Sequence, residues 1–429
     1  MMRRLITTAS LSALSAMASR GAVFAGILFT AHSLGPTAFG QFTLIQTTAL
    51  LFTTFCALSL GQMATKIVAE AAATDPRRIA TALTVSYGSA LFASLLFAAL
   101  LLALSYPLAV KVGGSNDLVA VYAASALLVL TGFLTAIQNG VALALHKVKE
   151  QALANLLSAP LVFLAIVLAA LRRDIAWAIY GYIAAQIVIV LGQEHALRRY
   201  RREQGHRLSL RATERGDWTV LWKLGLPSSV SGLLTMPSIW LSMVMLSSSA
   251  GGATSLGNFS LGNQARSILM FGMGVVANAT LPLLAAALAR GDKHEANTAL
   301  RHSILLLVTV TAAVAGLVAV AAPPLIHRFA PAYAGAIVPL QWLLLSTVAM
   351  APTTILMRKA TADGRPGVLF AGNAVFSAAL LGASVLALRL HGGATGLAIA
   401  YVVATTAQLS TFALCNRGEF RKALPGNPQ

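Results

Sequence analysis

The chain has 429 residues, of which 57% are apolar and only 10% are charged. Soluble domains carry roughly 25% charged residues, so the composition excludes an ordinary soluble protein and indicates a polytopic membrane protein. The formal net charge of +18 would suggest nucleic-acid binding in a soluble protein, but we expect no nucleic-acid partner for so apolar a chain. The two cysteines, Cys56 and Cys415, predict neither a disulfide framework nor a metal site.

The apolar stretches predict an all-α membrane protein with twelve spans, since one span needs about 20 predominantly apolar residues. The N-terminus imitates a secretory signal, but its apolar sequence continues past Arg20 to Leu34, so we interpret it as an uncleaved first span. The predicted spans are 11–34, 41–64, 79–105, 118–143, 153–171, 175–195, 219–246, 256–284, 301–322, 336–356, 368–388 and 394–415.

A basic segment near the middle of the chain divides these spans into two sets of six. We predict an N-lobe at 1–196, a loop at 197–218, a C-lobe at 219–416 and a tail at 417–429. The loop contains seven arginines, namely Arg198, Arg199, Arg201, Arg202, Arg207, Arg211 and Arg215. Because lysine and arginine gather in cytoplasmic loops, we predict that this loop and both termini are cytoplasmic.

The two halves resemble each other in sequence. Residues 39–46, FGQFTLIQ, align with residues 256–263, LGNFSLGN, and the shared Gly, Phe and Leu recur at a spacing of 217 residues. Asn155 and Asn373 match at nearly the same spacing. Because each copy holds an even number of spans, the pattern predicts a parallel repeat about an axis along the membrane normal.

Polar side chains are concentrated in the first, second, seventh and eighth spans, where they form helical stripes. Small hydroxyl residues also let membrane helices pack closely, and this alternative stays open for each stripe. The concentration in corresponding spans favours a hydrophilic cavity. The candidate sugar-binding residues on these stripes are Ser19, Gln46, Ser231, Thr235, Asn263 and Ser267.

Two arginines, Arg20 and Arg266, lie within spans, at a depth of about 14 Å at roughly 1.5 Å per residue. A charge at that depth costs about 2.5 kcal/mol or more, so each arginine should face water or an anion; a structural arginine that caps backbone carbonyls is the alternative. No Asp or Glu falls inside a predicted span, since Glu194 is placed at a span end. The natural counter-ion is therefore a ligand, and guanidinium groups bind phosphate in bidentate fashion.

The remaining sequence offers no phosphate-binding loop, metal-ligand spacing or nucleophile motif, so we expect no cofactor, no metal and no enzymatic activity. His32 and His302 lie near span ends and are either proton carriers or interfacial polar residues.

The chain resembles the polysaccharide repeat-unit (O-antigen type) flippases of the multidrug/oligosaccharidyl-lipid/polysaccharide exporter superfamily. The resemblance rests on residues 34–42 (LGPTAFGQF), the arginine of the first span, residues 222–227 (WKLGLP) and residues 257–259 (GNF) leading to Arg266. It implies a V-shaped transporter with two pseudo-symmetric six-helix lobes around a central cavity. It also implies a bacterial inner-membrane protein that alternates between inward-facing and outward-facing states and moves undecaprenyl-pyrophosphate-linked oligosaccharide to the periplasmic leaflet.

Two other functions compete with this prediction. Drug antiporters of the same superfamily use intramembrane carboxylates for cation coupling, which the predicted spans lack. A glycan polymerase or ligase needs a sizeable outer loop, and the longest here has about a dozen residues. The expected partners are thus a lipid-linked glycan and membrane lipids, with a polysaccharide polymerase and glycosyltransferases as candidate pathway partners.

Overall fold

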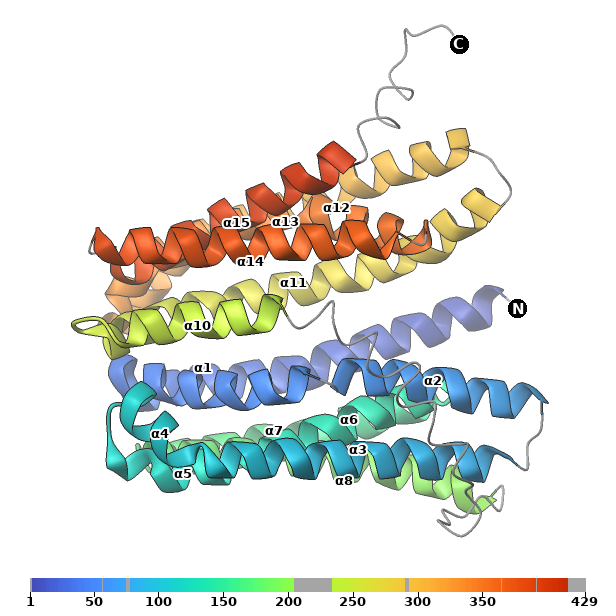
Figure 1. Ribbon diagram of the computed structural model, residues 1–429, viewed down its shortest axis with the longest axis horizontal. Helices are drawn as coiled ribbons and strands as arrows, with labels where there is room; N and C mark the ends of the chain where they lie inside the picture. The colour runs from blue at the N-terminus through green and yellow to red at the C-terminus, as the bar shows by residue number, and fades with distance from the viewer. Residues whose placement is uncertain are drawn as a thin grey trace, which may run out of the picture. The chain divides into compact units, whose positions relative to one another are not determined.

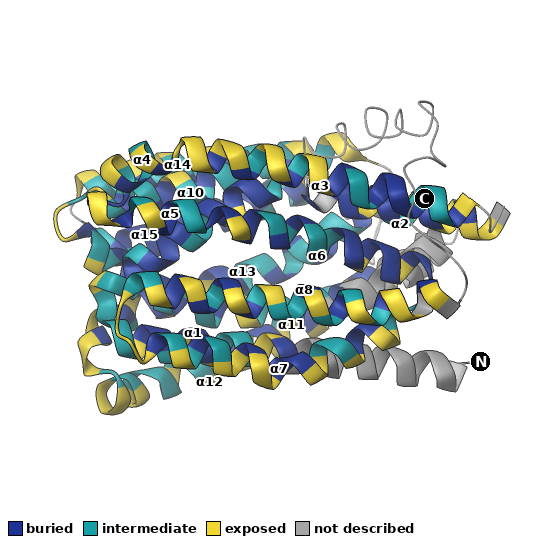
Figure 2. Cartoon of the chain, turned by 90° about the horizontal axis from the view of Figure 1, so that it is seen from below, coloured by how far each residue is buried: buried dark blue, intermediate teal, exposed yellow. Residues whose placement is uncertain are grey.

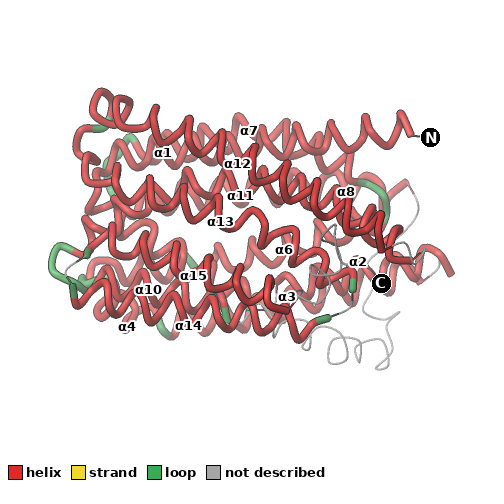
Figure 3. Tube along the Cα trace, turned by 90° about the horizontal axis from the view of Figure 1, so that it is seen from above, coloured by secondary structure: helices red, strands yellow, loops and turns green. Residues whose placement is uncertain are grey.

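The computed structural model describes residues 2–203 and 234–415, except residues 56, 75–77, 290–292, 364 and 391. Within these ranges the chain is helical apart from short turns, and no strand is present (Figure 3). The all-α prediction is confirmed. Among the described residues, nine helices are long and apolar enough to cross a membrane.

The described chain divides into two compact units. The N-terminal unit comprises Met1–Leu34 and Gln41–Met236, and the C-terminal unit comprises Gly35–Gly40 and Pro237–Gln429. Most of the segment predicted as the inter-lobe loop, 204–218, lies outside the described residues, as does the first part of the predicted span 219–246.

In each unit the long helices run side by side (Figure 1). The principal helices of the N-terminal unit are α1 (Met2–Thr54), α2 (Ala57–Thr74), α3 (Ile79–Ala103), α5 (Val119–Ala124), α6 (Ala126–Ala144), α7 (Val148–Ala170) and α8 (Ile175–Glu203), with short turns between α3 and α5. Those of the C-terminal unit are α10 (Thr235–Ser247), α11 (Gly252–Ala289), α12 (Lys293–Phe329), α13 (Ile337–Ala362), α14 (Pro366–Arg389) and α15 (Gly393–Cys415).

Helix α1 contains the first predicted span and the first part of the second, and it is broken at one residue. Gly35 adopts φ 76° and ψ 172°, a left-handed conformation that glycine reaches without a Cβ penalty. Pro36 follows and disfavours the helical conformation in the residue before it. The break thus replaces the longer loop that we predicted between the first two spans.

Two predicted boundaries were wrong. The predicted span 41–64 is not continuous, because α1 ends at Thr54 and α2 begins at Ala57. The last predicted span of the first half ends at residue 195, whereas α8 continues to Glu203. Arg198, Arg199, Arg201 and Arg202 therefore belong to a helix and not to a loop, because Glu194 pairs with arginines four and seven residues later and supports the additional turns.

A close backbone crossing lies inside the C-terminal unit, between the segment Gly35–Gly40 and the start of α11. A Cβ on Gly257 would overlap the carbonyl of Pro36, and a Cβ on Gly40 would overlap the carbonyl of Ala253. The hydroxyls of Thr37 and Thr254 share a 2.7 Å hydrogen bond across this crossing. Small residues allow helices in membranes to approach in this way.

The structure supports the internal repeat with contacts that recur in the two units. Helix α7 packs most extensively on α8, and α14 packs most extensively on α15. Each pair is joined by a glutamine that donates to an asparagine, at 3.0 Å between Gln193 and Asn155 and at 3.1 Å between Gln408 and Asn373. The asparagines are the pair that the sequence repeat matched.

Buried and exposed residues alternate along the long helices, as expected for amphipathic packing of apolar helices (Figure 2). Large apolar side chains are exposed along α12, including Leu305, Leu317 and Val320. An exposed apolar surface of this kind suits a lipid environment. The V-shaped arrangement of the two lobes stays a prediction.

We expect Gly257→Ala to destabilise the protein, because a methyl group there meets backbone and overpacking costs typically about 1–3 kcal/mol. The matched control is Gly272→Ala on the same helix, where an added Cβ has no neighbour within 4 Å. The control should leave the apparent melting temperature of the detergent-purified protein unchanged or raise it slightly, because alanine favours helix. Equal melting temperatures for the two variants would contradict the crossing.

Candidate functional site

Arg266 is the more deeply buried of the two arginines that the sequence placed within spans. It lies on α11, one turn after Asn263, and only 6% of its surface is exposed. Taking a guanidinium out of water costs several kcal/mol. In the described part of the chain no carboxylate lies within ion-pair distance of it. The charge is therefore compensated by other means.

Three neutral groups surround the Arg266 guanidinium. Nη1 donates to the Oδ1 atom of Asn263 at 3.2 Å, and Nη2 faces the Sδ atom of Met350 at 3.8 Å. The guanidinium carbon lies 4.9 Å from the ring centroid of Tyr401. A cation over an aromatic face is stabilised by about 2 kcal/mol or more when it is desolvated. Nε is buried and has no hydrogen-bond partner, so the cation retains unused donor capacity.

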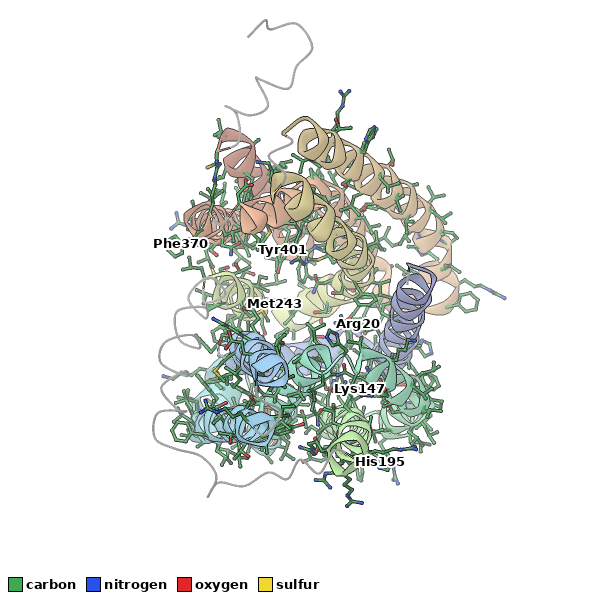
Figure 4. All side chains as sticks on the ribbon, turned by 90° about the vertical axis from the view of Figure 1, so that its right-hand side faces the viewer. Arg20, Lys147, His195, Met243, Phe370 and Tyr401 are labelled. Carbon is green, nitrogen blue, oxygen red and sulfur yellow. The ribbon has the colours of Figure 1, made fainter. Side chains whose placement is uncertain are left out.

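Tyr401 is held firmly beneath this arginine. Its ring lies against Phe259 of α11 at 5.5 Å and against Phe376 of α14 at 6.5 Å between centroids. Its hydroxyl hydrogen-bonds with Ser242 of α10. In Figure 4 Tyr401 lies among the helices of the C-terminal unit, whereas Phe370 lies on the outer side. The tyrosine therefore ties three helices to the position of the guanidinium.

Arg20 has a related environment in the N-terminal unit. It is an exposed residue of α1 and lies within electrostatic range of the Tyr182 hydroxyl on α8. The same hydroxyl receives hydrogen bonds from the side chains of Gln46 and Gln186. Phe42 packs edge-on against Tyr182 at 6.2 Å. Gln46 and Arg20 thus both interact with Tyr182. Ser19, which precedes Arg20 in the chain, is buried.

The predicted hydroxyl stripes have a mostly local bonding pattern. Thr47 donates to the carbonyl of Thr43, and Ser267, an exposed residue, donates to the carbonyl of Asn263. Such bonds satisfy a hydroxyl within its own helix, so neither hydroxyl needs a sugar as a partner. Thr235 is half-buried at the start of α10, and Ser231 lies outside the described residues. The sugar-binding roles remain predictions.

Glu194 was expected at a span end, but it forms the centre of a largely buried cluster on α8. One carboxylate oxygen receives hydrogen bonds from Tyr87 at 3.0 Å and Gln138 at 3.1 Å. The other receives hydrogen bonds from the guanidinium groups of Arg198 and Arg201. Because this carboxylate is already paired with two arginines, it is not a counter-ion for Arg20 or Arg266.

Four residues near the arginines were not predicted, because the prediction rested on arginines, amides and hydroxyls of the first, second, seventh and eighth spans. They are Tyr182, Gln186, Met350 and Tyr401. A signal for the tyrosines was present. Ala178-Ile179 and Ala398-Ile399 match in the repeat, and a tyrosine follows each match within four residues. Nothing in the sequence distinguishes Met350 from the other methionines.

Comparison with known proteins identifies the family. The model of the family described as "Polysaccharide biosynthesis protein" matches residues 6–288, more than half of the chain. The chain belongs to this family. The MatE family also matches, over residues 227–388. The resemblance to polysaccharide flippases of the exporter superfamily is thereby confirmed.

Relatives of this family member are exporters and transporters. The EPS I polysaccharide export inner membrane protein EpsE of Ralstonia solanacearum is 27% identical over 90% of this chain and 87% of its own length. Two solved structures share the fold. A multidrug resistance MATE family transporter in an inward-facing conformation has a TM-score of 0.81 at 17% identity, covering 95% of this chain and 96% of that one. A transporter of the same superfamily from Pyrococcus furiosus has a TM-score of 0.69 at 16% identity, covering 97% and 96%.

We expect Arg266→Met to stabilise the ligand-free protein, because it replaces an unpaired buried charge with an apolar side chain of similar length. Each kcal/mol gained should raise the apparent melting temperature by roughly 2–4 °C. Arg301→Met, which changes an exposed arginine of α12, is the matched control and should have little effect. If Arg266 were a structural residue, its replacement would lower the melting temperature instead.

Proposed function

We propose that this protein is a flippase that moves undecaprenyl-pyrophosphate-linked oligosaccharide from the cytoplasmic to the periplasmic leaflet of a bacterial inner membrane. The observation that carries the proposal is the buried Arg266, whose described partners are all neutral and whose Nε donor is unused. A phosphate group supplies the missing charge and accepts two parallel hydrogen bonds from one guanidinium. Arg20 supplies a second phosphate-binding cation.

The family and its relatives support a polysaccharide substrate. EpsE is an export protein for a polysaccharide, and the matching family is one of polysaccharide biosynthesis. We infer the inner-membrane location from EpsE, which is an inner membrane protein. We infer that both termini are cytoplasmic from the distribution of basic residues. Undecaprenyl pyrophosphate combines a lipid tail with the anionic group that the arginines require.

A cation-coupled drug antiporter is the second candidate, because the MATE transporters share the fold. A cationic drug would face Arg266 without an intervening carboxylate. Two like charges in a poorly hydrated region repel each other strongly. Within the described residues, the one carboxylate placed well inside a helix of the N-terminal unit, Glu194, is engaged by two arginines. The charge arrangement therefore favours an anionic substrate.

In cells whose glycan export depends on this protein, we expect Arg20→Ala and Arg266→Ala to reduce export about tenfold or more, because one lost charge-assisted hydrogen bond costs roughly 1.5–3 kcal/mol. Arg→Lys at either position should restore export only in part, because lysine lacks the bidentate fork. Arg301→Ala is the control for a lost positive charge. Membrane insertion should be equal for all variants, and full export by both alanine variants would refute the proposal.

We also expect the membrane potential to accelerate flipping. A headgroup with one or two negative charges gains about 2.3 kcal/mol per charge per 100 mV when it moves toward the positive side. In proteoliposomes at symmetric pH without sodium, a valinomycin-imposed potential that is negative on the side of the basic segment should increase the flipping rate of a pyrophosphate-linked glycan. Flipping that follows a pH or sodium gradient instead would contradict this mechanism and would direct attention to His32 and His302.

A further inference from the structure

One edge of the Arg266 guanidinium lacks a strong hydrogen-bond acceptor. The N–H bonds of Nε and Nη2 point in the same direction, and this edge binds two oxygens of an anion side by side. Nε is buried and has no hydrogen-bond partner. Nη2 contacts the thioether sulfur of Met350. The Nη1 group faces Asn263, and the flat face lies over Tyr401. Of the two nitrogens that form this edge, Nη2 contacts a single sulfur atom and Nε has no hydrogen-bond partner.

Met350 is a weak and movable partner for that edge. A thioether sulfur is a poor hydrogen-bond acceptor, and 3.8 Å is a long contact even for sulfur. Methionine has three rotatable bonds and adapts to changes in its surroundings. Its side chain is half-buried on α13, so it does not belong to the fully packed core.

The helix around Met350 is also weakened. Pro352 lies inside α13 and has no amide hydrogen, so it cannot donate to the carbonyl of Val348. The hydroxyls of Thr353 and Thr354 donate to the carbonyls of Ala349 and Met350 at 3.4 Å and 3.0 Å. Hydroxyl bonds of this kind often bend helices. The backbone ladder of α13 therefore lacks one hydrogen bond next to Met350, so a local shift breaks fewer bonds there than in a proline-free turn.

We propose that Met350 is a placeholder ligand, which contacts Nη2 of Arg266 in the empty carrier and is displaced when a pyrophosphate group binds the Nε–Nη2 edge. The inference rests on the proposed function and adds a residue to it. Met350 keeps the edge covered by a neutral group, so that the empty site does not retain small anions. The incoming phosphate gains two charge-assisted hydrogen bonds and gives up only one weak contact with sulfur.

The displacement can be observed directly at the methionine methyl group. The protein is labelled with 13C at its methionine methyls in lipid nanodiscs, and the Met350 signal is assigned from Met350→Leu. Undecaprenyl pyrophosphate and inorganic pyrophosphate are titrated separately. The Met350 signal should move with binding, because the methyl leaves the neighbourhood of the guanidinium and its aromatic partner. The signal of Met357, seven residues later on the same helix and packed near Leu356 and Phe412, should stay in place.

The two ligands distinguish the source of the phosphate. Movement with both supports displacement by the pyrophosphate group itself, and movement with the lipid form alone supports displacement that also needs the lipid. Binding is measured in parallel by calorimetry on the intact protein and on Arg266→Gln. If binding depends on Arg266 but the Met350 signal does not move, the placeholder is refuted and the proposed function stands. If neither ligand shows binding that depends on Arg266, both are refuted.

Met350→Leu tests the energetic consequence, because it removes the sulfur but keeps the bulk. The variant loses the weak contact between the sulfur and Arg266 in the ligand-free protein. Because pyrophosphate then displaces nothing, its binding should tighten about two- to tenfold. Met357→Leu makes the same change in an apolar cluster and should leave the affinity unchanged. An unchanged or weakened affinity of Met350→Leu, relative to Met357→Leu, would overturn the inference.

Discussion

The buried charge of Arg266 imposes the constraint on which the C-terminal unit depends. A guanidinium that is 94% enclosed must be compensated, and here an amide, an aromatic ring and a thioether share the task. This explains why Tyr401 contacts α10, α11 and α14 at once. Each contact fixes the ring under the cation, and a fixed ring offers its full electrostatic attraction without a further loss of conformational freedom.

The two units share a tyrosine but differ in the arginine. Tyr182 lies on α8 and Tyr401 on α15, and each packs against a phenylalanine that the sequence repeat relates, Phe42 and Phe259. Arg20, however, comes from the first half of α1, whereas Arg266 comes from α11, the counterpart of the second half of α1. One arginine is exposed and the other buried. The tyrosine–phenylalanine contact thus recurs in the two units, whereas the arginine near it lies on non-corresponding helices.

Much of the fold could be predicted from the sequence, because helix length and apolar composition are enforced by the membrane at every span. The asparagines at positions 155 and 373 and the arginine positions were visible for the same reason, since polar residues are rare in such a chain. The break at Gly35, the end of α1 at Thr54 and the extension of α8 to Glu203 were not. They depend on single backbone angles and on ion pairs with Glu194, which apolar composition does not register.

The partners of Arg266 were hidden for a different reason. Met350 and Tyr401 lie 84 and 135 residues from it in sequence, and both are ordinary constituents of an apolar helix. Both side chains are uncharged, and this property suits them as partners of Arg266. A carboxylate at the same place would pair with the arginine permanently and would compete with any phosphate for the same edge, at a cost of several kcal/mol to displace. Neutral groups stabilise the cation enough for folding and leave its charge available to an anion. The proposed anion site therefore contains few residues that sequence patterns mark as functional.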